Sequence, residues 1–472
     1  MAKSDILFPE FDSPTRKSTI VVASFNLTAT IMGGGILSIP FAFSKTGILL
    51  GPLLMLVAAI ATERCMYLIC LCSRQTGAKT FGEVAAVAFG KKMEYFIAGL
   101  LCVFLMFAII GYMVLAKDIW MSIISVIGNM DTAPNDELVL AAIIVLIVPF
   151  LVQKSLYALR FNCYVGFVSV SILCFALVRH AWTAAVWPDP ILWSTNFEDI
   201  LIAFPIISLS FLGIFNVLPI QNALVTPSRS RILFVVDGAI STVLVISLLF
   251  GLAGYLLAGS KTDGNILNNC DTANNLNLLL GQMGCGTMVV LAIPIMTIPC
   301  RSSLLEVLDV LVNGPHITPV EMEETEKLPL IASDANSNDN NYNATDTASD
   351  QQNQQKEQTA GEGKKSTNQN KLRKVNITDN AFIHYASTFF IFASCYMVAI
   401  RVPGVAVVWA ILGCSMGYFI SFVFPCACYL KIQKLYPAHA SDSKVWSWFA
   451  WTLLVMAVAS MVACTAEVIK RL

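Results

Sequence analysis

Long apolar segments separated by short polar connections run through most of the chain. A transmembrane helix needs about 20 mostly apolar residues, and eleven segments come close to that length. The pattern therefore predicts an all-α polytopic membrane protein. The predicted spans cover residues 19–43, 48–72, 93–116, 138–156, 158–179, 200–222, 231–258, 277–300, 379–400, 404–430 and 444–468.

Composition supports this class and argues against others. Of the 472 residues, 56% are hydrophobic and 13% are charged, against roughly 25% charged residues in soluble domains. The net charge of −1 gives no reason to expect nucleic-acid binding. The four histidines lack metal-ligand spacing, and no phosphate-binding loop occurs. We therefore expect no enzyme, no cofactor and no metal site.

Two polar segments set the domain boundaries. Residues 1–18 form an N-terminal tail, and residues 313–377 are too polar and too poor in aromatic side chains to fold. Spans one to eight then occupy 19–312, and spans nine to eleven occupy 378–472. With the tail in the cytosol, the short inner loops hold roughly twice as many Lys and Arg residues as the outer ones. We expect 313–377 to be a disordered cytosolic loop that either docks a cytosolic partner or serves as a passive linker.

Most of the 14 cysteines lie inside apolar segments, where a free thiol behaves as a small hydrophobic group. Cys270 lies in a loop. A disulfide from Cys270 to Cys285 is an alternative to two free thiols.

Three consecutive glycines, Gly33, Gly34 and Gly35, lie within the first span. Each weakens a helix by about 1 kcal/mol relative to alanine. Irregular backbone at membrane depth is tolerated only where protein or a wet cavity surrounds it. The triplet therefore predicts a break in the helix.

The sixth span carries a second interruption, in which Gly213 and Pro219 bracket Asn216. Spans one and six correspond if the first ten helices form two five-helix repeats. A matched pair of broken segments indicates a transporter binding site, because the free N–H groups attract an anion and the free carbonyls attract a cation. The alternative is that the glycines only allow tight helix packing and the proline only kinks its helix.

Glu63 and Arg64 lie within the second span, where charge is costly and usually functional. Neighbours in a helix point about 100° apart, so we expect these two not to pair with each other. Glu63 is a candidate ion-coupling or gating group. The alternative is a structural salt bridge or a side chain that extends toward the cytosol.

Several motifs together resemble the amino acid/auxin permease family, near the branch with the sodium-coupled neutral amino acid transporters and the plant vacuolar amino acid transporters. The resemblance covers the membrane part but not the polar loop. It is carried by Phe25–Pro40, Asn216–Ile220, Gly251–Gly259 with Asn265–Leu267, Pro294 with Pro299–Arg301, and Phe424–Leu430.

The resemblance implies a LeuT-like inverted repeat, with helices 1–5 and 6–10 as the two repeats and one extra helix. It implies alternating-access transport of amino acids, with neutral ones expected. The backbone from Thr30 through Met32 and Gly33 to Gly35 would hold the substrate carboxylate. The side-chain pocket would be shaped by Phe211, Gly213, Phe215 and Asn216.

Two departures bear on the coupling ion. By this resemblance, Asn26 matches the asparagine that holds the cation in sodium-coupled members. The hydroxyl group expected in the eighth span is missing from Val289–Pro294, and Ala29 stands where the sodium-coupled relatives have an asparagine. We therefore expect proton coupling or exchange rather than sodium symport. A plasma membrane and a vacuolar or lysosomal membrane both fit. The alternative function is an amino acid sensor or receptor on the same fold.

Overall fold

The computed structural model describes residues 16–128, 135–151, 160–183, 191–270, 276–313, 381–402, 404–436 and 444–471. In these ranges the chain is almost wholly helical, and its β-structure is one isolated bridge between Ser18 and Leu224. The predicted loop 313–377 lies outside the described residues, apart from its first residue. So do the tail before Arg16 and the turn between the fourth and fifth predicted spans.

The first predicted span is broken where the glycine triplet predicts. Helix α1 covers Ile20–Ile31, and a 3₁₀ turn, η2, covers Gly34–Ser38 and leads into α2 at Ile39–Thr46. The two halves differ in direction by 50°. Pro40 lies in the first turn of α2, a position where its missing N–H costs little.

The sixth predicted span is also broken. Helix α8 covers Phe197–Leu209 and α9 covers Ile214–Ala223. The interruption lies at residues 210–213, while Pro219 lies inside α9. A proline at 219 leaves the carbonyl of Phe215 without its usual helical donor. The prediction of paired breaks is confirmed.

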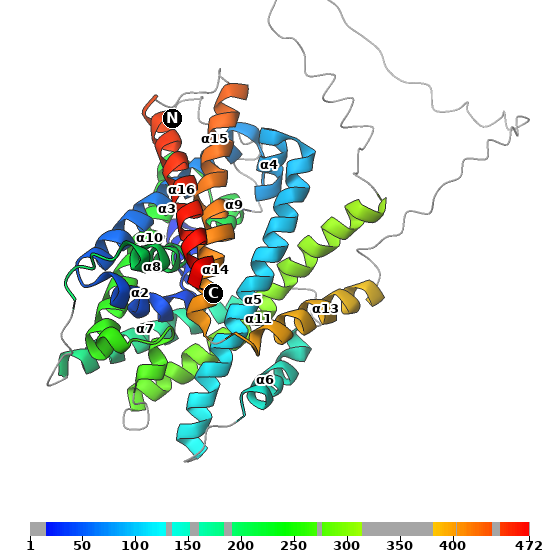
Figure 1. Cartoon of the computed structure of the whole chain (residues 1–472). Coiled ribbons are helices and arrows are strands. Elements are labelled where there is room, and N and C mark those ends of the chain that lie inside the picture. The colour runs from blue at the N-terminus through cyan, green and yellow to red at the C-terminus, as the bar shows by residue number, and fades with distance from the viewer. Residues whose placement is uncertain are drawn as a thin grey trace, which may run out of the picture.

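The remaining helices cover the predicted spans (Figure 1), but α5 and α11 run past the predicted ends at 116 and 300 to Gly128 and Asn313, and α4 is an additional short helix. They are α3 Leu50–Thr76, α4 Phe81–Phe89, α5 Lys91–Gly128, α6 Asp136–Leu151, α7 Arg160–Thr183, α10 Arg229–Ala258, α11 Leu276–Asn313, α13 Ala381–Ala399, α14 Val405–Leu412, α15 Phe424–Leu435 and α16 Lys444–Arg471. Two π-helical turns, Gly413–Gly417 and Phe419–Val423, join α14 to α15.

The expected count of eleven spans is not confirmed. Among the described residues, nine helices are long and apolar enough to cross a membrane, or ten with the bent pair α1 and α2. The predicted span 138–156 corresponds to α6, which has 16 described residues. At 1.5 Å per residue this is about 24 Å, shorter than a hydrocarbon core of about 30 Å.

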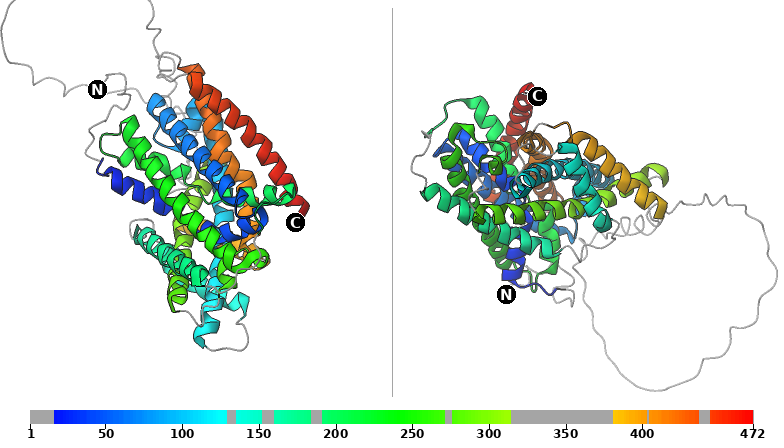
Figure 2. Two further views of the ribbon diagram at one scale, coloured as in Figure 1. Left: turned by 90° about the vertical axis from the view of Figure 1, so that its left-hand side faces the viewer. Right: turned by 90° about the horizontal axis from the view of Figure 1, so that it is seen from below.

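The bundle places the two broken spans at its centre. Helix α5 packs along α11, α11 packs along α7, and α10 packs against α1, α2 and α3. Figure 2 shows α16 lying along one side of the bundle against α15. Helices α6 and α13 lie on another side, next to α5 and α11.

Three short elements mark the two opposite faces of the bundle. Helix α4 joins α3 to α5 at one face, which is here called the α4 face. The 3₁₀ turns η4, Gly259–Lys261, and η5, Ile266–Asn269, lie at the opposite face. There, the Ser38 hydroxyl donates to the Gly264 carbonyl at 2.6 Å.

Glycines on α10 allow α2 to approach unusually closely. A Cβ atom at Gly251 would lie 2.7 Å from Cγ2 of Ile39, and one at Gly254 would lie 2.6 Å from Cγ of Pro40. Any larger residue would push the two helices apart, because real Cβ atoms do not come so close to other atoms.

Candidate functional site

The two helix breaks touch each other. A Cβ atom at Gly213 would overlap Cγ1 of Ile31, the last residue of α1, and a Cβ atom at Gly35 would lie 3.7 Å from Cα of Ser210. Gly213 has φ −160°, so backbone strain does not require glycine there. The requirement comes from the close packing of one break on the other.

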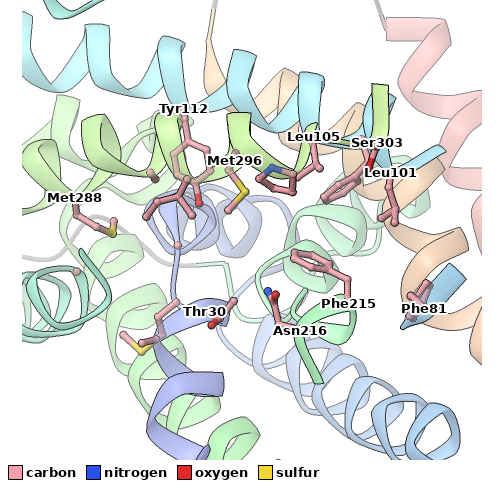
Figure 3. A pocket seen from close by; sticks show the side chains of 18 residues that line it. Thr30, Phe81, Leu101, Leu105, Tyr112, Phe215, Asn216, Met288, Met296 and Ser303 are labelled. Carbon is pink, nitrogen blue, oxygen red and sulfur yellow. The ribbon is translucent and has the colours of Figure 1, made fainter. Parts of the chain in front are cut away.

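A cavity of about 410 Å³ lies beside the two breaks. In Figure 3, Thr30 and Asn216 lie near each other on one side of it, with Phe215 next to Asn216 and with Tyr112 and Met296 on the opposite wall. The cavity continues past these residues toward Phe81 of α4 and Ser303 of α11, so it extends toward the α4 face. Its lining residues are Ala29, Thr30, Met32, Gly33, Phe81, Leu101, Phe104, Leu105, Tyr112, Gly166, Phe215, Asn216, Met288, Ala292, Ile295, Met296, Pro299 and Ser303.

A second space of about 60 Å³ lies on the other side of the breaks. It reaches Trp409 and Leu412 of α14 and Ser210 of the second break. The two spaces share a wall of six residues, which separates the large cavity from the face opposite α4. These residues are Thr30, Gly33, Phe104, Tyr112, Phe215 and Met296.

The backbone at the breaks presents partial charges of both signs. The N–H groups of Met32 and Gly33 are used within the first break, because they donate to the carbonyls of Thr28 and Ile31, each at 2.8 Å. At the start of α9, helix geometry leaves the N–H groups of Ile214 and Phe215 without an intrahelical acceptor, so positive partial charge faces the breaks. The carbonyl that Pro219 frees on Phe215 supplies negative partial charge nearby.

The structure brings most of the predicted substrate residues together. Five of them line the large cavity, namely Thr30, Met32, Gly33, Phe215 and Asn216. Gly35 lines the small space. The Thr30 hydroxyl donates to the Asn26 carbonyl at 2.6 Å, so its lone pairs are what it offers a ligand.

Three predicted substrate residues lie next to the cavities without lining them. Gly34 is buried, and a Cβ atom there would lie 2.6 Å from Cδ2 of Leu115. Phe211 is fully buried in the core. Gly213 packs on Ile31 as described above. These three residues lie next to residues that line the two spaces and do not line them themselves.

The two predicted coupling residues lie away from both spaces. Asn26 does not line either of them, although it is exposed on α1. Glu63 is buried on α3, and the expectation that it does not pair with Arg64 is wrong. Nε of Arg64 lies 3.0 Å from Oε2 of Glu63, because a long arginine side chain can bend back across the roughly 100° between neighbouring positions.

Sequence reasoning missed the wall that faces the breaks. Tyr112, Phe104, Met288 and Met296 come from α5 and α11, and each stands in an apolar run like any core residue. Ser303 is polar, but it lies in the last part of α11, beyond the segment first predicted to span. Only the packing of α5 and α11 on the breaks identifies these residues.

The architecture matches a known fold of multi-pass membrane proteins. Its fold resembles that of Mhp1, a transporter of the nucleobase-cation-symport-1 family, in a closed conformation with bromovinylhydantoin bound. The TM-score is 0.50 at 12% sequence identity, over 98% of this chain and 95% of that one. At that identity the likeness concerns the fold alone, which is the predicted LeuT-like fold.

The sequence then places the chain within a family. Residues 16–470 match the family model of the transmembrane amino acid transporter proteins, so the chain belongs to this family, and the predicted resemblance to the amino acid/auxin permeases is confirmed.

Among curated relatives, Vacuolar amino acid transporter 7 of Saccharomyces cerevisiae is 28% identical over 62% of this chain and 60% of its own length. Amino acid transporter AVT6E of Arabidopsis thaliana is 26% identical over 55% of this chain and 56% of its own. Solute carrier family 38 member 10 of Homo sapiens is 23% identical over 59% of this chain and 25% of its own. The matched part of the chain thus spans between a quarter and three fifths of these three relatives.

Proposed function

We propose that this protein is a secondary active transporter that moves amino acids, neutral ones above all, by alternating access. The observation that carries the proposal is the contact between two broken helices, Gly213 on Ile31, beside a cavity of about 410 Å³. Family membership supports it, as do the relatives named as amino acid transporters.

The cavity favours substrates with one charged end and an apolar side chain. The charged end would lie at the breaks, with the carboxylate on the backbone from Thr30 to Gly35 and the ammonium near the Asn216 side chain and the freed Phe215 carbonyl. The side chain would extend among Phe104, Met288 and Met296. These groups are apolar and adaptable, which suits several neutral side chains better than charged ones.

Proton coupling or exchange accounts for the residues better than sodium symport does. A bound metal cation needs several oxygen ligands. The Asn26 side chain does not line the cavities, and the stretch from Val289 to Pro294 on α11 contributes no hydroxyl group. Uptake should therefore respond to a proton gradient or to substrate on the far side, and not require sodium.

The charge pattern and the cavity together favour a conformation in which the cavity is open toward the cytosol. If the N-terminal tail is cytosolic, the α4 face is cytosolic too, because α1 begins and α3 ends there. The large cavity extends toward that face, while the wall formed with Tyr112 closes it toward the other. The structure then corresponds to a transporter loaded or emptied from the cytosol. A vacuolar or related membrane agrees with the name of the Saccharomyces cerevisiae relative.

Uptake into proteoliposomes of a panel of labelled amino acids, with proton and sodium gradients imposed separately, tests the proposal. The diagnostic variant is Gly34→Leu, because a side chain there collides with Leu115 and Tyr112 behind the break. Its matched control is Gly404→Leu, at a glycine where an added Cβ atom would meet no other atom within 4 Å. We expect saturable uptake by the wild type and the control and at least a tenfold loss in Gly34→Leu. Absence of saturable uptake by folded wild-type protein would refute the function.

A further inference from the structure

Three charged side chains lie close together along the membrane-spanning helices, apart from the cavity; the Glu63 side chain is buried, that of Arg64 is 39% exposed, and Asp237 is exposed. Glu63 and Arg64 lie on α3, and Asp237 lies on α10, which packs against α3. The Glu63 side chain is nine-tenths buried, and its Oε2 accepts from Nε of Arg64 at 3.0 Å. The Arg64 guanidinium lies 5.8 Å from the ring centroid of Trp446, near the start of α16.

The other oxygen of Glu63, Oε1, is buried and lacks a donor among the described residues. The carboxyl of Asp237 lies within hydrogen-bonding reach of the Glu63 carboxyl. Two ionised carboxylates are both acceptors and cannot form this bond, so one of the pair must carry a proton. Arg64 and Asp237 are the charged groups that act on Glu63 in the described part of the chain.

The charges lead to the same conclusion. Two carboxylates and one guanidinium leave one uncompensated negative charge at membrane depth, which is unfavourable. Two like charges in contact also disfavour full ionisation. Binding one proton makes the group neutral and supplies the missing hydrogen bond. We propose that Glu63, Asp237 and Arg64 form a binding site for a single proton, which the two carboxyls share.

This site is connected to the proposed substrate site through both of its helices. Met66 lies one turn after Glu63, and its Cε would be 3.6 Å from a Cβ atom at Gly213. On α10, the carbonyl of Val235 accepts a hydrogen bond at 3.1 Å from the hydroxyl of Ser24 on α1. Loss of the proton would make the two carboxylates repel each other and push α3 and α10 apart. The proposal rests on the proposed function, since it assigns the coupling proton a place.

Proteoliposomes that contain a pH-sensitive dye test it, with an equimolar mixture of labelled neutral amino acids as substrate. We expect wild-type uptake to carry protons inward. Glu63→Gln and Asp237→Asn should each reduce substrate-dependent proton flux at least tenfold while exchange of internal for external amino acid stays within threefold. The matched control is Glu467→Gln, because Glu467 is similarly buried and its Oε1 accepts from Nε of Arg471 at 2.8 Å, but it lies at the far end of α16. Its proton flux should stay at the wild-type value.

The outcomes separate the proton site from transport itself. Undiminished proton flux in Glu63→Gln or Asp237→Asn would overturn the site, and so would wild-type uptake without proton movement, although amino acid transport would then stand. Infrared titration of purified protein provides a test that needs no transport and no gradient. A protonated-carboxyl C=O band should disappear in both variants and persist in Glu467→Gln. Persistence of that band in both variants would also overturn the site, and it could do so even if no amino acid were transported.

Discussion

Tyr112 and Trp409 meet edge to face, with ring centroids 5.8 Å apart and planes at 78°. Tyr112 belongs to the wall that closes the large cavity, and Trp409 lines the small space behind that wall. Gly111 makes room for the indole, because a Cβ atom there would lie 2.6 Å from Cη2 of Trp409. The pair closes the route between the breaks and the face opposite α4.

Trp409→Ala should open this route. We expect a cysteine introduced by Met296→Cys to react at least tenfold faster with a membrane-impermeant maleimide added from the face opposite α4. Trp448→Ala is the control, because Trp448 is 74% exposed on α16 and its loss leaves the wall intact. Equal labelling rates in the two variants would mean that other side chains close the route.

The contact between the breaks predicts a compensating pair of substitutions. Gly213→Ala places a methyl group on Ile31, so uptake should fall at least tenfold. The double variant with Ile31→Ala vacates that volume and should recover much of the uptake, since contacting residues show large coupling. Gly404→Ala should leave uptake unchanged. If the losses of uptake in Gly213→Ala and Ile31→Ala simply add in the double variant, the two residues are not in contact.

Lys117 on α5 is buried and pairs with Asp136 at the start of α6, with Nζ 3.2 Å from Oδ2. Asp136→Asn leaves the buried ammonium without its counter-charge. We expect a loss of about 1 kcal/mol of stability, a modest value because the Asp136 side chain is half exposed and solvent screens the pair. Thermal unfolding in detergent measures the effect, with Glu137→Gln, at the next and exposed position, as the control. An equal loss of stability in Glu137→Gln would show that removing any acidic charge at this end of α6 has the same effect, and that the Lys117–Asp136 pair contributes nothing specific.

Cys270 and Cys285 are free thiols in the structure, not the disulfide that was the alternative. Burial raises the pKa of the Cys270 thiol to about 11. The reactive thiolate forms as pH rises through the pKa, so about 0.3% is ionised at about pH 8.5, where an ordinary thiol is half ionised. Maleimide labelling that is lost in Cys270→Ser should still rise about tenfold per unit between about pH 8.5 and 10. A plateau above about pH 9 would contradict the burial.

The sequence was informative where a residue type breaks a rule of membrane helices. Three glycines in one apolar run and a glycine–proline pair in another weaken a helix. Although the second break lies at residues 210–213 and Pro219 stays inside α9, both breaks were predictable. Their mutual contact was not, because the closeness of Gly213 and Ile31 depends on how α8 and α9 pack on α1. The count of spans also depended on α6, which has 16 described residues and is apolar only after Asp136 and Glu137.

The opposite wall of the site carried no such signal. Tyr112, Met288 and Met296 are ordinary residues of buried helices, and only the crossing of α5 and α11 over the breaks turns them toward the cavity. The partnership of Glu63 with Arg64 was likewise hidden, because helical geometry fixes where Cβ atoms point but not where a long side chain ends. Breaks in the backbone could be predicted from the sequence, whereas contacts between side chains of different helices could not.

The close seating of α2 on Gly251 and Gly254 of α10 has a mechanical consequence. With no side chain between them, these two segments can neither slide nor separate without losing a continuous layer of contacts. The α2 half of the first span should therefore move with α10. The α1 half also packs along α10, where the Ser24 hydroxyl donates to the Val235 carbonyl, so the break at Met32 and Gly33 is carried on α10 from both sides, together with the place where the substrate is proposed to sit.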